Sequence, residues 1–192
     1  MSSNPSDHPS TLPLFMGKKI RRSSSESKKP AGDLLNLHSN SNVMKFFSKT
    51  VKVFLGDTQV LFSDEVVKVN RKLKSQKRVF VVTDKGLYNL LPESFKCQRR
   101  IALDKLGGIS MSCLTDNFFA LHVPTEYDYL IVSSRKIEAT IVMSEAFKRL
   151  TSHDLPVHFA NTFEYRIDDK ISKEIIFTEV DDGVSTQIFQ KK

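Results

Sequence analysis

The stretch VLFSDEVVKVNRKLKSQKRVFVVTDKGLYNL, residues 60–90, decides the fold of this chain. It consists of short β-branched and aromatic runs separated by turn residues, a pattern typical of antiparallel strands. Residues 60–69 predict one strand, interrupted at 63–65 by a bulge or turn. Residues 78–82 predict a second strand, and the turn residues 84–86 predict a tight hairpin into a third.

Downstream of this stretch the strand pattern continues and then gives way to a helical one. Further strands are predicted at 96–103, 109–113, 118–123 and from 127, which makes about seven antiparallel strands. Ser134 can cap a helix that runs to about Ser152. Its apolar residues recur at helical spacing, and we expect them to form the buried side: Ile137, Ile141, Met143 or Ser144, Phe147 and Leu150.

Seven meandering strands followed by one helix is the element order of a pleckstrin-homology barrel, whose helix closes one open end. Three more strand-like segments follow, at 157–166, 171–180 and 184–189, with Asp-rich turns between them. We expect this C-terminal extension, about residues 157–190, to extend or cover the barrel rather than form a separate core. The predicted fold class is therefore mainly β with one C-terminal helix (α+β), a pleckstrin-homology-like antiparallel barrel with extra C-terminal strands.

The first 31 residues have a different composition, rich in Ser, Pro, Lys and Arg. Such a segment buries too little apolar surface to offset its ordering entropy, so we expect a disordered arm at 1–31. Its basic residues are possible accessory contacts for an anionic partner: Lys18, Lys19, Arg21 and Arg22. One folded domain is expected over 32–190, with a short helix at 42–49 and the barrel core at about 51–153.

The bulk composition narrows the function classes without choosing among them. Lysine and arginine number 29 against 22 acids, a net charge of +7 and a pI of about 9.4, which favours polyanions such as nucleic acid or anionic lipid. No apolar run approaches the roughly 20 residues that a membrane-spanning helix needs. The two cysteines have no metal-ligand spacing, and no metal or cofactor is expected.

The densest positive charge lies in the connection between the first two predicted strands. Residues 68–78 contain no acid and six cations: Lys68, Arg71, Lys72, Lys74, Lys77 and Arg78. A hairpin would fold this run back so that its two ends converge on one concave mouth. Near an anionic surface, about 1 kcal/mol per basic residue gives about 6 kcal/mol, below the roughly 8 kcal/mol of micromolar affinity. Specific headgroup contacts, the basic arm, or Leu73 dipping into the membrane interface would supply the rest, and Arg99 and Arg100 could enlarge the patch.

Residues 60–72 and 76–88 resemble the opening of the tail homology 1 domain of class I myosins. Supporting resemblances follow in order at 32–37, 100–103, 108–112, 116–123 and 127–130, so that the likeness covers about residues 32 to 180. The resemblance implies a pleckstrin-homology-like fold, binding to acidic phospholipids including phosphoinositides, and anchoring of an actin motor to membranes. The family's lipid-site signature falls on Lys68, Lys77 and Arg78. The 192 residues hold no motor domain and no IQ repeats, so motor activity is not carried over.

We therefore expect a non-catalytic, peripheral membrane-binding domain, cytoplasmic and acting at the inner face of membranes. A protein–protein adaptor of the actin cytoskeleton and a basic nucleic-acid-binding protein are the alternatives. Nucleic acid is not the expected partner, because the basic run lacks interleaved aromatics. An enzyme is the weakest alternative, since the five histidines are scattered and none lies near an evident nucleophile. His122, within a predicted strand, is interpreted as a hydrogen-bonded structural histidine.

Overall fold

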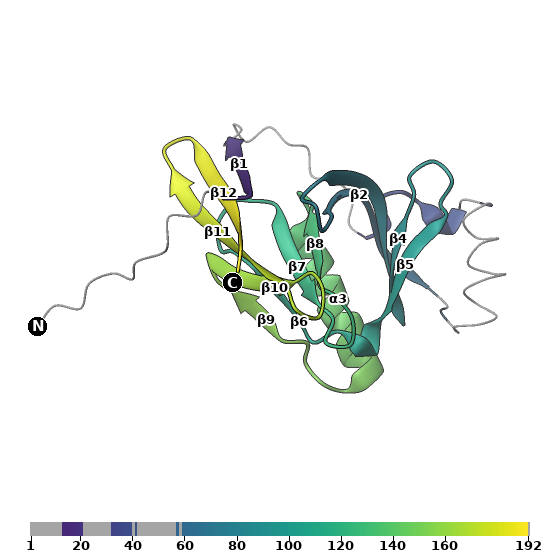
Figure 1. Cartoon of the computed structure of the whole chain (residues 1–192). Coiled ribbons are helices and arrows are strands. Elements are labelled where there is room, and N and C mark those ends of the chain that lie inside the picture. The colour runs from purple at the N-terminus through teal and green to yellow at the C-terminus, as the bar shows by residue number, and fades with distance from the viewer. Residues whose placement is uncertain (1–12, 21–31, 40, 42–56, 58, 192) are drawn as a thin grey trace, which may run out of the picture.

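The computed structural model describes residues 13–20, 32–39, 41, 57 and 59–191 (Figure 1). The predicted helix at 42–49 and the basic residues Arg21 and Arg22 lie outside the described residues.

The predicted meander of seven strands followed by a helix is confirmed (Figure 1). The strands are β2 Val60–Val69, β3 Ser75–Thr83, β4 Gly86–Leu90, β5 Cys97–Ala102, β6 Gly108–Met111, β7 Phe118–His122 and β8 Tyr129–Val132, followed by helix α3 Lys136–Thr151. These seven strands and β9, Val157–Phe159, form one sheet in the order β5-β4-β3-β2-β8-β7-β6-β9. The strands β5 and β6 are joined by a 3-10 turn, Leu103–Lys105, and do not pair with each other. Helix α3 packs against this turn and so covers the opening of the curled sheet.

Strand β2 is continuous through Ser63, Asp64 and Glu65, so the expected interruption there is wrong. The register shift lies earlier, between Val60 and Phe62. Ser63 and Asp64 are buried, which the strand tolerates because both side chains have hydrogen-bond partners. The Ser63 hydroxyl donates to Asp33 and accepts from the backbone amide of Leu35, and Asp64 accepts from the Ser133 hydroxyl at 3.2 Å.

Helix α3 exists where it was predicted, but its buried face differs from the expected one. Met143 and Phe147 are buried as expected, together with Ala139 and Ala146. Ile137, Ile141 and Leu150 are instead 50%, 54% and 40% exposed. The helix is rotated relative to the apolar pattern because it also buries Lys136, whose ammonium pairs with the buried Asp116 carboxylate at 3.1 Å. Its N-cap residue is Arg135, with no capping side chain, so the predicted Ser134 cap is wrong.

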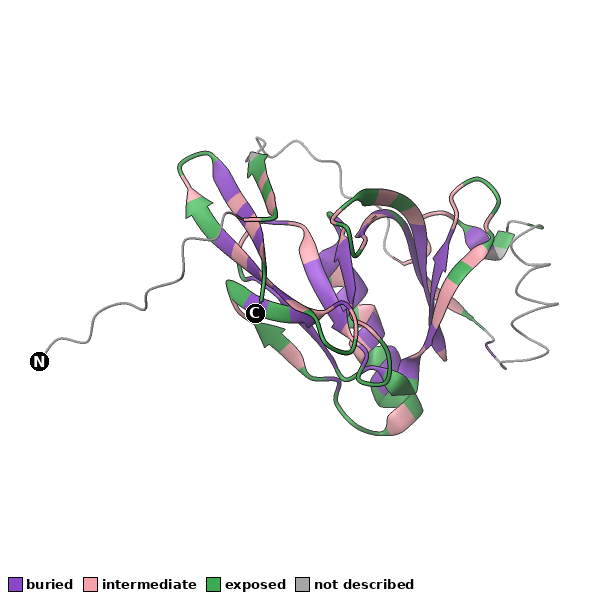
Figure 2. Ribbon diagram, in the orientation of Figure 1, coloured by how far each residue is buried: buried purple, intermediate pink, exposed green. Residues whose placement is uncertain are grey.

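A second sheet covers the outer face of the barrel (Figure 1). It has the order β1-β12-β11-β10, from β1 Phe15–Ile20, β12 Gly183–Gln190, β11 Ser172–Val180 and β10 Thr162–Arg166. Its alternating apolar residues, such as Phe177 and Ile188, pack on Ala120 and Leu130 from the barrel wall. Buried positions therefore lie both inside the barrel and between the two sheets (Figure 2). The C-terminal extension covers the barrel and shares a second hydrophobic cluster with the barrel wall.

Strand β1 lies inside the segment that the sequence predicts to be a disordered arm, so that prediction is wrong for Phe15–Ile20. It pairs antiparallel with β12, with Phe15 opposite Ile188, and the Phe15 ring contacts Phe118 edge-on at 6.2 Å. Lys18 pairs with Asp182 at 2.7 Å, and Lys19 donates to the Thr115 carbonyl and the Asn117 side chain. These long-range partners supply the ordering energy that the local sequence lacks.

Replacing Phe15 tests whether β1 contributes to stability. Phe15→Ala should lower the free energy of unfolding by about 1–2 kcal/mol, because a half-buried ring and its aromatic contact are lost. Met16, on the same strand but 67% exposed, is the matched control, and Met16→Ala should change stability by less than about 0.5 kcal/mol. Urea unfolding measures both, and equal effects would show that β1 is not docked.

Candidate functional site

The basic hairpin ends in a tight turn that its own side chains hold. Asn70 accepts hydrogen bonds from the backbone amides of Lys72 at 2.9 Å and Lys74 at 3.0 Å. Leu73 adopts a left-handed conformation, with φ of 58°, and packs against the second hydrophobic cluster. Leu73 is therefore half-buried in the protein rather than free to enter a membrane interface. The turn presents Arg71, Lys72 and Lys74 as exposed side chains.

The pairing register of β2 and β3 sorts the hairpin cations between two faces. Val66 pairs with Arg78, Lys68 with Gln76, and Val67 with Lys77. Because side chains alternate along a strand, Lys68 and Arg78 share the face of Val66, which is part of the barrel core. Lys77 lies on the opposite, outer face. The structure thus brings together two of the three signature residues, Lys68 and Arg78, and separates the third.

Three further residues join Lys68 and Arg78 at the hairpin end of the barrel, and we call the set of Lys68, Arg78, Arg99, Tyr127 and Tyr129 the mouth cluster. The Lys68 ammonium lies 4.7 Å from the Tyr129 ring centroid and 5.9 Å from that of Tyr127. The Arg99 guanidinium lies 3.8 Å from the Tyr127 ring centroid. Such cation–π contacts attract each cation to a ring while leaving its charge in place. The two tyrosines carry no sequence signal for such a role, and only the fold reveals it.

Positive charge in the mouth cluster exceeds the negative charge that is paired with it. Arg99 pairs with Glu126 at 2.9 Å and donates to the Tyr127 carbonyl, and its side chain is only 8% exposed. The buried Nε of Arg78 and the Nε and Nη1 of Arg99 have no hydrogen-bond partner among the described residues. Burial, together with repulsion from Arg99, Arg78 and Arg71, lowers the pKa of Lys68. A half-buried group of cations with unused donors is the environment that an anion would stabilise.

Arg100, which the sequence suggests as an accessory cation, lies on the outer face of β5 and not in the mouth cluster. Its guanidinium pairs with the buried Asp57 carboxylate at 3.1 Å and donates to the Tyr88 hydroxyl at 2.8 Å. Asp57 also accepts from Thr83 and Tyr88, both at 2.6 Å. Burial and the Asp57 carboxylate raise the pKa of Tyr88 above its ordinary value. This network is a structural contact between distant segments, and Lys18 and Lys19 are likewise bound at the second sheet and a barrel loop.

His122 has the neighbours that the sequence did not reveal, so the expectation that no nucleophile lies near it is wrong. Its Nε2 lies 2.7 Å from the Ser110 hydroxyl and its Nδ1 lies 2.9 Å from the Asp128 carboxylate. Asp128 also accepts from the backbone amides of Val123 and Arg166, each at 2.9–3.0 Å. Burial opposes ionisation, but these hydrogen bonds prevail and lower the pKa of Asp128. Ser110 is 4% exposed, so the chain of contacts joins strands β6 and β7 to β10 as a structural link.

The described residues, 13–20, 32–39, 41, 57 and 59–191, hold neither a candidate metal centre nor a helix that could span a membrane. Those residues contain no group of three or more His, Cys, Asp or Glu side chains arranged to hold a metal ion. Within the same ranges, no helix has the length and apolar character needed to cross a bilayer.

Removing the Lys68 charge should stabilise the fold while preserving its shape. A lysine pKa that is lowered on folding means that the unfolded chain binds more protons, so stability rises as pH rises through the lowered pKa. Lys68→Met should therefore raise stability near neutral pH by about 0.5 kcal/mol, a figure discounted for solvent screening. Urea unfolding at pH 7 and pH 10 should show this advantage shrinking as pH rises. The exposed Lys74→Met is the control, and a clear loss of stability in Lys68→Met would contradict charge crowding.

The Arg100 network should contribute to the stability of the fold. Arg100→Ala should lower the free energy of unfolding by about 2 kcal/mol, because it leaves the buried Asp57 carboxylate without its cation. The exposed Lys96→Ala, just before the same strand, should stay within about 0.5 kcal/mol of the wild type. Thermal unfolding measures both variants. An Arg100→Ala protein of unchanged stability but reduced lipid binding would place Arg100 in the binding site instead.

Comparison with known proteins identifies the family of the chain. Residues 21–192 match the family model described as "Unconventional myosin tail, actin- and lipid-binding". The chain is 30% identical over 171 residues to Myosin IB heavy chain of Dictyostelium discoideum, covering 85% of this chain and 15% of that protein. It is 31% identical over 162 residues to Unconventional myosin-Ia of Homo sapiens, covering 80% of this chain and 15% of that protein.

Among solved structures, the linker-DH/PH domains of p115-RhoGEF align with a TM-score of 0.44 at 16% identity, covering 65% of this chain and 38% of that one. The chain spans about 15% of the length of the two myosin heavy chains named above. By the match of its sequence over most of its length, the chain belongs to the unconventional myosin tail family, the tail homology 1 domains of class I myosins, which are described as actin- and lipid-binding.

Proposed function

We propose that this domain attaches peripherally to the cytoplasmic face of membranes by binding the phosphorylated headgroup of an anionic lipid at the mouth cluster. The observation that carries the proposal is the convergence of Lys68, Arg78 and Arg99 on one end of the barrel with more positive than paired negative charge. The domain contributes binding and no catalysis. The family description as lipid-binding supports the lipid, and the mouth geometry supports the site.

The mouth cluster and the outer hairpin cations would play different parts. Lys72, Lys74 and Lys77 are exposed, so each would add about 1 kcal/mol of non-specific attraction near an anionic bilayer. Together they would contribute about 3 kcal/mol of the roughly 8 kcal/mol that micromolar affinity requires. The half-buried cations of the mouth cluster would supply the remainder, because charge-assisted hydrogen bonds are stronger where water is excluded.

We infer that the preferred headgroup is a phosphoinositide. Lys68, Arg78 and Arg99 come from three different strands, so they approach a common point from separate directions. A headgroup with several phosphates can contact all three at once, whereas a single phosphate diester cannot. Burial and repulsion from neighbouring arginines lower the pKa of Lys68, and a bound anion would favour its charged form, so binding should weaken as pH rises through that lowered pKa.

Vesicle co-sedimentation with charge-matched double variants tests the proposal. Lys68→Ala/Arg78→Ala removes two inner cations, and Lys74→Ala/Lys77→Ala removes two exposed cations from the same hairpin. On phosphoinositide-containing vesicles the inner pair should lose at least about tenfold in affinity, from the loss of two charge-assisted contacts. On phosphatidylserine vesicles without phosphoinositide, both pairs should lose a similar, smaller factor. If the two double variants lost the same affinity on both kinds of vesicle, the binding would be non-specific charge attraction and the proposed site would be wrong.

The same variants separate the rival functions. A nucleic-acid-binding protein would retard oligonucleotides in a gel and remain in the supernatant with vesicles. An actin-cytoskeleton adaptor would co-sediment with actin filaments independently of the Lys68→Ala/Arg78→Ala change. Either result, combined with absent binding to phosphoinositide vesicles, would overturn the proposal.

A further inference from the structure

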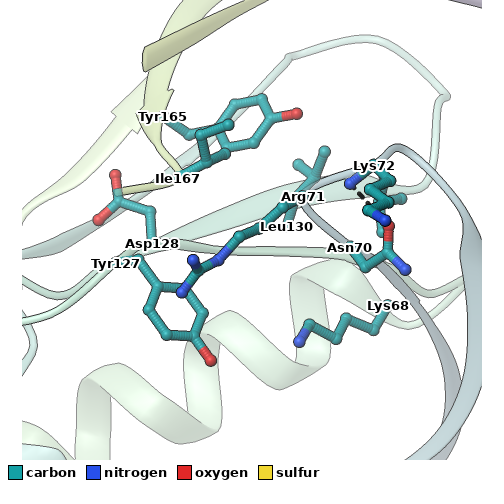
Figure 3. Close-up of a pocket in the computed structure, with 10 residues that line it drawn as sticks. Lys68, Asn70, Arg71, Lys72, Tyr127, Asp128, Leu130, Tyr165 and Ile167 are labelled. Carbon is teal, nitrogen blue, oxygen red and sulfur yellow. Dashed lines mark hydrogen bonds between the residues drawn. The ribbon is translucent and has the colours of Figure 1, made fainter. Parts of the chain in front are cut away.

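A second concave site adjoins the mouth cluster, between the hairpin and the second sheet, and shares Lys68 and Tyr127 with it. This side pocket has a volume of about 310 Å³, at the small end of the range of ligand pockets. Figure 3 shows Arg71, Lys72 and Asn70 on its hairpin side, and Tyr165 and Ile167 on the side of the second sheet. The barrel alone could not form it, because Tyr165 lies on β10 and Ile167 follows directly after that strand.

A buried lysine fixes the hairpin against the second sheet and so shapes the side pocket. The Lys173 ammonium, on β11, donates to the Arg71 carbonyl at 2.7 Å, and Lys173 is 4% exposed. Leu73 packs on the same second cluster from the other end of the turn. The pocket is thus held open by two contacts that do not depend on the rim side chains of Arg71 and Lys72.

The side pocket combines an apolar wall with a cationic rim. Its wall includes Leu130, Ile167 and the ring of Tyr165. Its rim carries Arg71 and Lys72, with Lys68 at the border with the mouth cluster. The hydroxyl of Tyr165 is buried, and the structure gives it no hydrogen-bond partner within the described part of the chain. Burial raises the pKa of Tyr165, so the hydroxyl stays protonated and can donate.

The one carboxylate among the lining residues does not cancel the rim charge. Asp128 already accepts from His122 and from two backbone amides, those of Val123 and Arg166. Its negative charge is therefore compensated from its own side of the pocket. Arg71 stacks on the Tyr127 ring at 4.7 Å and keeps its guanidinium directed along the rim (Figure 3). The free charge at the entrance is positive.

We propose that the side pocket binds a second lipid, an anionic phospholipid whose phosphate lies between Arg71 and Lys72 and whose glycerol ester and first acyl carbons lie against Tyr165, Ile167 and Leu130. The cationic rim selects an anion, and the apolar wall requires that the anion carry a chain. The inference rests on the proposed function in taking a membrane lipid as ligand. It adds a site that contacts the first acyl carbons of a lipid, next to a site that binds a headgroup.

The two sites share the Tyr127 ring as a common wall and Lys68 as a common cation. Arg99 of the mouth cluster contacts this ring at 3.8 Å, and Arg71 of the side-pocket rim contacts it at 4.7 Å. Two anions bound on either side would each neutralise part of one cationic cluster. Simultaneous occupation would restrict the orientation of the domain on a bilayer, because two bound lipids leave rotation only about the line that joins them.

Methyl NMR with soluble lipids tests the side pocket directly in the full chain. The probe is dihexanoyl phosphatidylserine below its micelle concentration, compared with glycerophosphoserine, which lacks the chains, and dihexanoyl phosphatidylcholine, which lacks the net charge. Saturable shifts of the Ile167 and Leu130 methyl groups are expected with the first compound and not with the other two. Equal shifts with glycerophosphoserine, or no shift at Ile167, would overturn the proposal.

Matched variants assign the contacts. Arg71→Gln/Lys72→Gln should weaken the binding of dihexanoyl phosphatidylserine by about tenfold. Lys74→Gln/Lys77→Gln, with the same change in charge, should have little effect on this affinity. Tyr165→Phe should weaken it by about fivefold, for one lost hydrogen bond, without lowering the unfolding temperature. The assigned contacts would be contradicted if both double variants weakened binding equally, or if Tyr165→Phe left binding unchanged.

A separate titration with inositol trisphosphate distinguishes this site from the mouth cluster. Loss of inositol trisphosphate binding in Arg78→Ala, a residue that does not line the side pocket, with the Ile167 shift by dihexanoyl phosphatidylserine retained, would support two sites. Absent inositol trisphosphate binding in the wild type, with the Ile167 shift present, would overturn the proposed headgroup site and leave the side pocket standing. The reverse result would overturn the side pocket alone.

Discussion

The register between β2 and β3 is the constraint on which the candidate site depends. It is fixed because Val66 and Phe80 must both face the barrel core, and both are almost completely buried. A slip of one residue would move every side chain of the strand to the other face. The same pairing that buries Val66 therefore directs Lys68 and Arg78 inward and Lys77 outward. The fold positions the cations as a consequence of burying its core.

Crowding cations at the end of a barrel costs stability, which other parts of the structure must offset. Burial, together with repulsion from the nearby Arg99 and Arg78, lowers the pKa of Lys68. The barrel core, the cluster under the second sheet and the Asp57–Arg100 network supply opposing contacts. Functional sites commonly break local rules in this way and rely on the rest of the molecule. The mouth cluster, which contains Arg99, is a site of this kind. The Arg100 network is not, although Arg99 and Arg100 are adjacent in sequence.

The second sheet changes what a barrel of this kind can do. It orders Phe15–Ile20 by pairing that strand with β12, and it anchors the hairpin turn through Lys173. It also supplies Tyr165, so that a surface of the barrel becomes one side of a pocket. An extension that covers apolar surface can thus create a binding site at its border.

Strand alternation and turn residues from 60 to about 130 were sufficient, in the sequence alone, to predict the meander, the basic hairpin and the family resemblance, because these signals are local. Only the tertiary structure decided which face each cation occupies. Arg99 and Arg100 look equivalent in sequence, yet alternation on β5 sends one to Tyr127 and the other to Asp57. Strand β1 is ordered by partners about a hundred or more residues away in the sequence. The buried face of α3 depends on a partner about twenty residues away. Long-range contacts carry no periodic signal, so their consequences appear only once the chain has folded.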